Sequence, residues 1–219
     1  MSNRRRHLER FARVARAARA TTIAGGAALV ATIASASPAV AHVGGPTRGL
    51  ADGVLHPLLG PDHLLAMVAV GIVAAVTASQ ARGPATRLGV WAAPAAFVTG
   101  TVVGGVLGIE GWQFPALELV IVLSVIALGI AVAGAGVGAG GRVAVWVPLL
   151  VLAGLAHGNA HGAEAPTAAS PALYVAGFVV ATVALHAAGV GSGLVVRRWP
   201  PARVAVGASM AAAGVLLLV

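Results

Sequence analysis

Long apolar runs, separated by short clusters of Arg, Pro and Gly, dominate the chain after its first fifty residues. Several of them approach or exceed the roughly 18–20 residues that a helix needs to cross a bilayer. Strict apolar–polar alternation is absent and Ala, Leu, Val and Gly prevail, which favours helices over the strands of a membrane barrel. The predicted spans are Leu55–Ala78, Leu88–Ile109, Pro115–Val137, Val143–Ala163, Pro171–Val196 and Val204–Val219. The fold class expected is an all-α membrane protein with a six-helix transmembrane bundle.

The N-terminal segment has the order of a secretory signal peptide. Seven Arg fall within the first nineteen residues, an apolar stretch runs from Thr21 to Ile33, and small residues follow. The triplet Ala39-Val40-Ala41 predicts cleavage before His42, with Ala34-Ser35-Ala36 as a weaker alternative. An uncleaved first helix is the other interpretation. If cleavage occurs before His42, residues 1–41 are a signal peptide and residues 42–219 form the transmembrane domain.

Composition and charge also indicate a membrane protein and bear on its expected partners. The chain is 58% hydrophobic and 9% charged, against roughly 25% charged in an ordinary globular domain, and its mean hydropathy is +0.93. The net charge of +8 falls to +2 after cleavage, because seven Arg and one Glu leave with the signal peptide. The basic excess is therefore mostly a targeting feature, and membrane lipid rather than nucleic acid is the expected partner. The absence of Cys and Lys excludes disulfides, thiolate sites and Schiff-base chemistry.

The loop charges predict an orientation by the positive-inside rule. With the mature N-terminus outside, six of the seven remaining Arg fall in inside loops. The inside residues are Arg82, Arg87, Arg142, Arg197, Arg198 and Arg203, and the outside ones are Arg48, Asp52, Glu110 and Glu164. The sequence thus predicts a multi-pass protein of the cytoplasmic membrane with its mature N-terminus outside.

Glycines recur at four-residue intervals within the predicted spans. Gly100, Gly104 and Gly108 form one such series, and Gly134 and Gly138 form another. Small residues at this spacing let helix backbones approach closely in lipid. We therefore expect both series to pack against neighbouring helices.

Ionisable side chains gather at the predicted outer ends of the spans. Each costs roughly 2.5–3.5 kcal/mol at the centre of a membrane helix, so each needs a reason. The outer group consists of His56, Asp62, His63, Glu118, His157, His161 and Glu164, and His186 lies in the middle of the fifth span. The inner halves of the spans carry almost none, so this clustering predicts a functional site.

The fourth span offers the strongest metal-binding pattern. His157 and His161 lie four residues apart and project from one helix face, and Glu164 follows three residues later. Two imidazoles at this spacing can share one metal ion. Two histidines so placed cannot take opposite faces of one haem, which counts against a membrane cytochrome. A zinc-dependent intramembrane hydrolase using the same residues is the alternative.

The stretch "HPLLGPDHLLAMVAVG" places its polar residues around a predicted break. Proline fits best at the first helical position and the residue before it avoids helical geometry. We therefore expect the regular helix to begin near Pro61, with Asp62 and His63 in its first turn, and "HPLLG" to be a bent or re-entrant segment. His42, as first mature residue, could chelate a metal through its amine and imidazole, although its position could equally reflect cleavage alone. Buried hydrogen-bonded and interfacial roles remain open for His186 and Glu118, respectively.

These segments resemble the HupE/UreJ family of hydrogenase and urease accessory membrane proteins. The first stretch is similar to the family pattern H-P-x-x-G-x-D-H-x-L-A-M-x-x-V-G. "PALELVIVLSVIALG" and "LAHGNAHGAEAP" resemble later segments, and "HVGG" resembles the processed N-terminus. Pro61 departs from the family, which usually has another residue there.

The resemblance implies a six-span permease for Ni²⁺, with Co²⁺ carried by some members, and no enzymatic activity. The functional residues that the resemblance implies are His56, Asp62, His63, Glu118, His157, His161 and Glu164, with His42 and His186 as further candidates. We expect capture of the ion at the outer face and transfer to a site within the bundle, with no prosthetic group. A homo-oligomer is compatible with the sequence.

Overall fold

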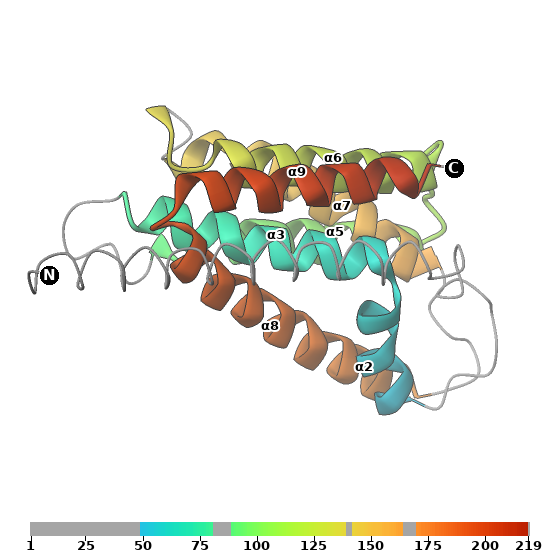
Figure 1. Cartoon of the computed structure of the whole chain (residues 1–219). Helices are drawn as coiled ribbons and strands as arrows, with labels where there is room; N and C mark the ends of the chain where they lie inside the picture. Colours follow the sequence, from blue (N-terminus) through green and yellow to red (C-terminus); the bar gives the residue numbers. More distant parts are fainter. Residues whose placement is uncertain (1–48, 81–88, 139–141, 164–169, 219) are drawn as a thin grey trace, which may run out of the picture.

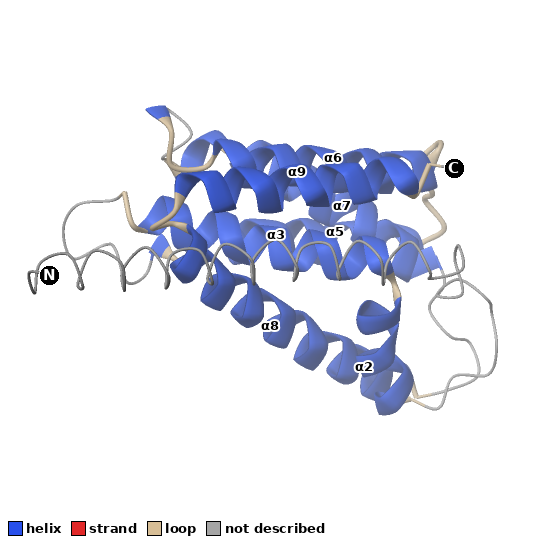
Figure 2. Ribbon diagram, viewed as in Figure 1, coloured by secondary structure: helices blue, strands red, loops and turns tan. Residues whose placement is uncertain are grey.

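The computed structural model describes residues 49–80, 89–138, 142–163 and 170–218, and every regular element in them is helical (Figures 1 and 2). The helices are α2 (Leu50–Leu59), α3 (Pro61–Ala78), α5 (Ala92–Ile109), α6 (Leu117–Gly134), η3 (Val143–Val145), α7 (Val147–Ala163), α8 (Pro171–Val196) and α9 (Pro200–Leu216). The predicted signal peptide lies outside the described residues.

Four of these helices are long and apolar enough to cross a membrane: Pro61–Ala78, Ala92–Ile109, Leu117–Gly134 and Ala172–Val196. The chain is thus an all-helical membrane protein, as the sequence predicts. Helices α7 and α9 have 17 residues each. That is about 26 Å at 1.5 Å per residue, close to the roughly 30 Å thickness of the hydrocarbon core. The count of six spans stays a prediction.

The predicted span Leu55–Ala78 is wrong as a single element. The chain forms two helices here, α2 and α3, separated at Gly60, whose backbone is extended (φ −80°, ψ 108°). The break is where the sequence places it, because Pro61 occupies the first turn of α3 and disfavours helical geometry at the preceding residue.

The expectation of a bent segment at "HPLLG" also needs correction, because its first four residues belong to α2. Pro57 lies inside this helix, a position that normally disrupts the backbone hydrogen bonds. Tertiary packing accounts for the helix. A Cβ on Gly53 would meet the backbone of Tyr174, and one on Gly177 would meet the backbone of Leu50, so α2 and α8 lie in direct backbone contact.

Helices α5 and α7 make the most extensive contact of any two described helices. The predicted glycine series on α5 accounts for one side of that contact. A Cβ on Gly100, Gly104 or Gly108 would meet the backbone of α7. The sequence analysis missed the matching series on α7, which consists of Gly154, Gly158 and Gly162 and faces the backbone of α5. Two interlocking rows of small residues therefore fix the position of α7, the helix that carries His157 and His161.

The second predicted series does not act as one. Gly134 packs on the ring of Trp146, but Gly138 has no heavy atom within 4 Å of a Cβ built on it and has a positive φ of 50°. Gly138 therefore serves the turn after α6 rather than helix packing. Its backbone conformation is one that residues with a Cβ rarely adopt.

Helix α3 is the central element, between α8 on one side and α6 and α5 on the others (Figure 1). Thirteen of its eighteen residues are buried, including His63 and Met67. Gly71 of α3 and Gly189 of α8 each face the other helix's backbone. The first turn of α3, where Asp62 and His63 lie, is consequently held rigidly inside the bundle.

Candidate metal centre

The first turn of α3 pairs two of the predicted residues. His63 Nδ1 lies 2.8 Å from Asp62 Oδ1, and the His63 side chain is fully buried. Gly60 makes room for this pair, because a Cβ there would lie 2.8 Å from His63 Nδ1 and 3.1 Å from Asp62 Oδ1. A carboxylate held against one imidazole nitrogen leaves the other nitrogen for a ligand, an arrangement common around metal-binding histidines.

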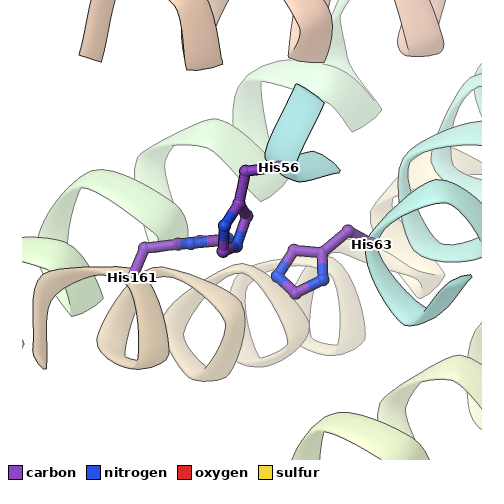
Figure 3. A group of neighbouring side chains, drawn as sticks. All are labelled: His56, His63 and His161. Atoms are coloured by element: carbon purple, nitrogen blue, oxygen red, sulfur yellow. The ribbon is translucent and has the colours of Figure 1, made fainter. Parts of the chain in front are cut away.

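Three imidazoles from three helices converge beside that pair. His56 comes from α2, His63 from α3 and His161 from α7, and Figure 3 shows their rings directed toward one another. The ring centroids are 4.5 Å apart for His56 and His161, 4.5 Å for His63 and His161, and 5.5 Å for His56 and His63. One potential ligand atom from each of the three lies within 4.8 Å of the others, close enough to hold one metal ion.

A second group of potential ligands shares His63 with the first. Asp62, His63 and His157 also bring one ligand atom each to within 4.8 Å of the others, and all three groups are buried. The rings of His63 and His157 are 4.9 Å apart and nearly perpendicular. The centre therefore contains four imidazoles and one carboxylate, with His63 common to two overlapping sets of three ligands.

Aromatic side chains enclose these histidines. The ring of Phe178 lies 4.6 Å from that of His161, Tyr174 lies 6.2 Å from His56, and Phe97 lies 5.8 Å from His157. Phe97 is fully buried. Such an apolar shell excludes water from the imidazoles and strengthens their electrostatic interaction with a cation.

Not all predicted residues join this centre. Glu118 is exposed, in the first turn of α6, and belongs to neither set of ligands. His186 is buried in α8, and its ring lies 5.7 Å from Phe97 rather than against another of the described histidines. His42 and Glu164 lie outside the described residues.

The sequence analysis missed two buried polar residues, one in contact with His157 and one between the two histidines of α7. Ser124 of α6 has its Oγ 3.2 Å from His157 Nε2. Asn159, between the two histidines of α7, donates from Nδ2 to the carbonyls of Gly104 and Trp112 and accepts at Oδ1 from the amide of Phe114. The signal that could have found them is an uncharged polar residue within a predicted membrane span, Ser in "IVLSVIA" and Asn in "HGNAHG". Such a residue needs a hydrogen-bond partner inside a membrane protein, just as an ionisable residue does.

The chemistry of the centre suits a borderline divalent cation. Imidazole nitrogen favours Zn²⁺, Ni²⁺, Co²⁺ and Cu²⁺ over the harder Mg²⁺ and Ca²⁺, and the chain has no Cys to create a thiolate site. One carboxylate offsets part of the ion's charge inside the bundle. Imidazole rings 4.5 Å apart lie too close together to bind a haem between them.

Comparison with known proteins shows the family of the chain. A family model described as HupE / UreJ protein matches residues 29–217. The chain belongs to the HupE/UreJ family. Protein HupE of Rhizobium leguminosarum bv. viciae is 42% identical over 198 residues, which cover 87% of this chain and 95% of that protein. No solved structure matches the chain. The resemblance inferred from the sequence motifs is thus confirmed, and the candidate metal centre lies within the matched residues of this HupE/UreJ protein.

Proposed function

We propose that this HupE/UreJ protein carries a divalent first-row metal ion, Ni²⁺ or Co²⁺, across the cytoplasmic membrane into the cell. The observation that carries the proposal is the convergence of His56, His63 and His161 from three helices at the end of an apolar bundle. Three mutually close imidazoles, with a fourth against His63, are too costly inside a membrane protein to be retained for packing alone. Family membership points the same way.

The ion enters at the outer end of the bundle in this proposal. His56, His63 and His161 bind it first, and Asp62 with His157 provides the next set of ligands, because His63 belongs to both. His42, Glu118 and Glu164 would act before this step as ligands near the outer face, and His186 after it, beyond Phe97. The membrane potential drives inward movement, which is worth about 4.6 kcal/mol for a divalent ion at 100 mV.

The topology proposed has six spans, with α3, α5, α6, α7, α8 and α9 crossing the membrane and α2 lying on the outer side. Its support is the separation of charge. The described arginines Arg142, Arg197, Arg198 and Arg203 precede α7, follow α8 and open α9, at the opposite end of these helices from His63 and His161. Under the positive-inside rule, that distribution supports an orientation with the arginines inside. Residues 1–41 act as a cleaved signal peptide.

The zinc-dependent hydrolase receives no support from the comparisons and is not proposed further. The family matched by the chain favours a membrane accessory or transport role. Among the described residues, no feature points to a substrate that the protein would hydrolyse.

Uptake of radiolabelled Ni²⁺ and Co²⁺ by cells that express the protein tests the proposal. The variant His63→Ala removes the ligand common to both sets and should reduce uptake to the level of cells without the protein. Thr77→Ala is the matched control, because Thr77 is a buried polar residue of the same helix whose hydroxyl bonds only within α3. Equal uptake of both metals by wild type and His63→Ala, at equal membrane expression, would refute the assignment.

A further inference from the structure

A serine on α6 contacts the metal centre from outside the sets of candidate ligands. Ser124 is buried, and its Oγ lies 2.7 Å from the carbonyl oxygen of Ile121 and 3.2 Å from His157 Nε2. Ser124 lies within the segment "PALELVIVLSVIALG", but neither set of candidate ligands includes it. Because Ser124 contacts one ring nitrogen of His157, it can determine which of the two nitrogens carries the proton.

The position of the single hydroxyl proton follows from these two distances. A carbonyl oxygen only accepts hydrogen bonds, so an oxygen–oxygen distance of 2.7 Å requires the proton of Ser124 to point at Ile121. This bond to the carbonyl three residues earlier is a common one for a serine within a helix. The serine oxygen can then only accept from His157.

The protonation of His157 follows in turn. A neutral imidazole carries one proton, and a hydrogen bond to an acceptor at Nε2 requires that proton to be on Nε2. Nδ1 then holds the lone pair. His157 belongs to the set of potential ligands with Asp62 and His63, and only a nitrogen with a lone pair can bind a metal there.

We propose that Ser124 is a positioning residue that holds His157 in the Nε2–H tautomer, so that Nδ1 is the atom offered to the metal. This inference rests on the proposed function for its role in metal binding, although the tautomer itself does not depend on it. Outer partners of metal-binding histidines typically contribute about 10- to 100-fold to metal affinity. Ser124 would thus extend the centre onto α6, from which none of the described ligand sets takes a residue.

Two variants of nearly equal shape separate the hydroxyl from the packing. Ser124→Thr keeps a hydroxyl that can bond to the same helix carbonyl, whereas Ser124→Val replaces it with a methyl group. Both add the same bulk, so their difference reports the hydroxyl alone. Ser192→Ala is the control for the loss of a serine–carbonyl bond within a helix, because Ser192 bonds to Ala188 on the exposed side of α8.

The tautomer is read directly in metal-free protein in detergent micelles, by long-range proton–nitrogen NMR of ¹⁵N-histidine, with His157→Gln to assign the signal. We expect an Nε2–H imidazole in wild type, Ser124→Thr and Ser192→Ala, and a rise of the Nδ1–H form in Ser124→Val. In a Ni²⁺ titration of the same samples, Ser124→Val should bind about 10- to 100-fold more weakly than Ser124→Thr.

Two results would overturn the inference: an Nδ1–H imidazole in wild type, or equal Ni²⁺ affinity in the Thr and Val variants. The wild-type spectrum keeps the test decisive even if a variant does not fold. Absence of Ni²⁺ and Co²⁺ binding by wild type would instead contradict the proposed function, and the NMR spectrum would still decide the tautomer.

Discussion

Asn159 provides the sharpest test of how the metal centre is held together. Its side chain is fully buried and joins α7 to two other parts of the chain. Nδ2 donates to the carbonyls of Gly104 on α5 (3.3 Å) and Trp112 in the connection that follows (2.6 Å), and Oδ1 accepts from the amide of Phe114 (3.0 Å). The substitution Asn159→Asp keeps the shape and the acceptor but removes both donors.

The size of the effect follows from these bonds. Hydrogen bonds inside membrane proteins average about 0.6 kcal/mol each, so the two lost bonds account for about 1.2 kcal/mol. A buried acceptor left without a donor adds about 1–3 kcal/mol. Gly104 is buried and Trp112 is exposed, so the cost of an acceptor without a donor applies once, to the carbonyl of Gly104. Because the new carboxylate is also buried, its desolvation adds to these terms, and the expected loss of unfolding free energy is at least about 2–4 kcal/mol.

The assay is equilibrium unfolding of the purified protein in mixed micelles of increasing denaturing detergent. Gln113→Glu is the matched control: it makes the same change from amide to carboxylate, in an exposed residue of the connection that Asn159 holds. That control should stay within about 0.5 kcal/mol of wild type. If Asn159→Asp were as stable as the control, the two bonds donated by Asn159 would not help to hold α7 against α5 and the connection that follows it, and the reasoning would be wrong.

Further predictions concern the glycines and the metal. Gly158→Ala should destabilise the protein by about 1–3 kcal/mol in the same assay, because a Cβ there would lie 2.7 Å from Thr101 Cα. Gly191→Ala has no heavy atom within 4 Å of the added Cβ and should stabilise the protein by up to about 1 kcal/mol. If both variants changed the stability in the same direction, the packing argument would be contradicted. Gly60→Ala should weaken Ni²⁺ binding in a titration, because its Cβ would lie 2.8 Å from His63 Nδ1; unchanged affinity would show that the Asp62–His63 pair does not contribute. Saturating Ni²⁺, at about 100 times its dissociation constant, should raise the stability of wild type by about 2.7 kcal/mol and that of His63→Ala by much less; an equal rise in both would place the ion elsewhere.

The sequence predicts most helices well because each is bounded by residues that stop or start a helix. Pro171 begins both the predicted span and α8, and prolines suit the first helical turn. Helix α9 begins at Pro200, four residues before the predicted start at Val204. The failure was at Pro57, which lies within α2. No local pattern reveals that Gly53 and Gly177 bring α2 and α8 into backbone contact, because that packing joins segments more than a hundred residues apart.

The same distinction explains which parts of the site could be predicted. The spacing of His157 and His161 fixes their shared face within one helix, and Pro61 fixes the start of another, so local rules place each residue on its element. Which residues meet depends on how α2, α3 and α7 pack, and here the charge of a residue is a poor guide. Glu118 has an ionisable side chain but is exposed and belongs to neither set of ligands, whereas Ser124 has none and contacts His157.

Glycine spacing connects this packing to the chemistry. The rows on α5 and α7 interlock at backbone contact, and the row on α7 alternates with the functional residues: Gly158 lies between His157 and Asn159, and Gly162 follows His161. One face of α7 therefore packs on α5 while the next presents imidazoles to α2 and α3. Because two rigid rows can engage only in register, a shift of one turn would move both histidines by about 5.4 Å and separate them from His56 and His63. The two glycine rows thus determine whether His157 and His161 can reach the other members of the two ligand sets.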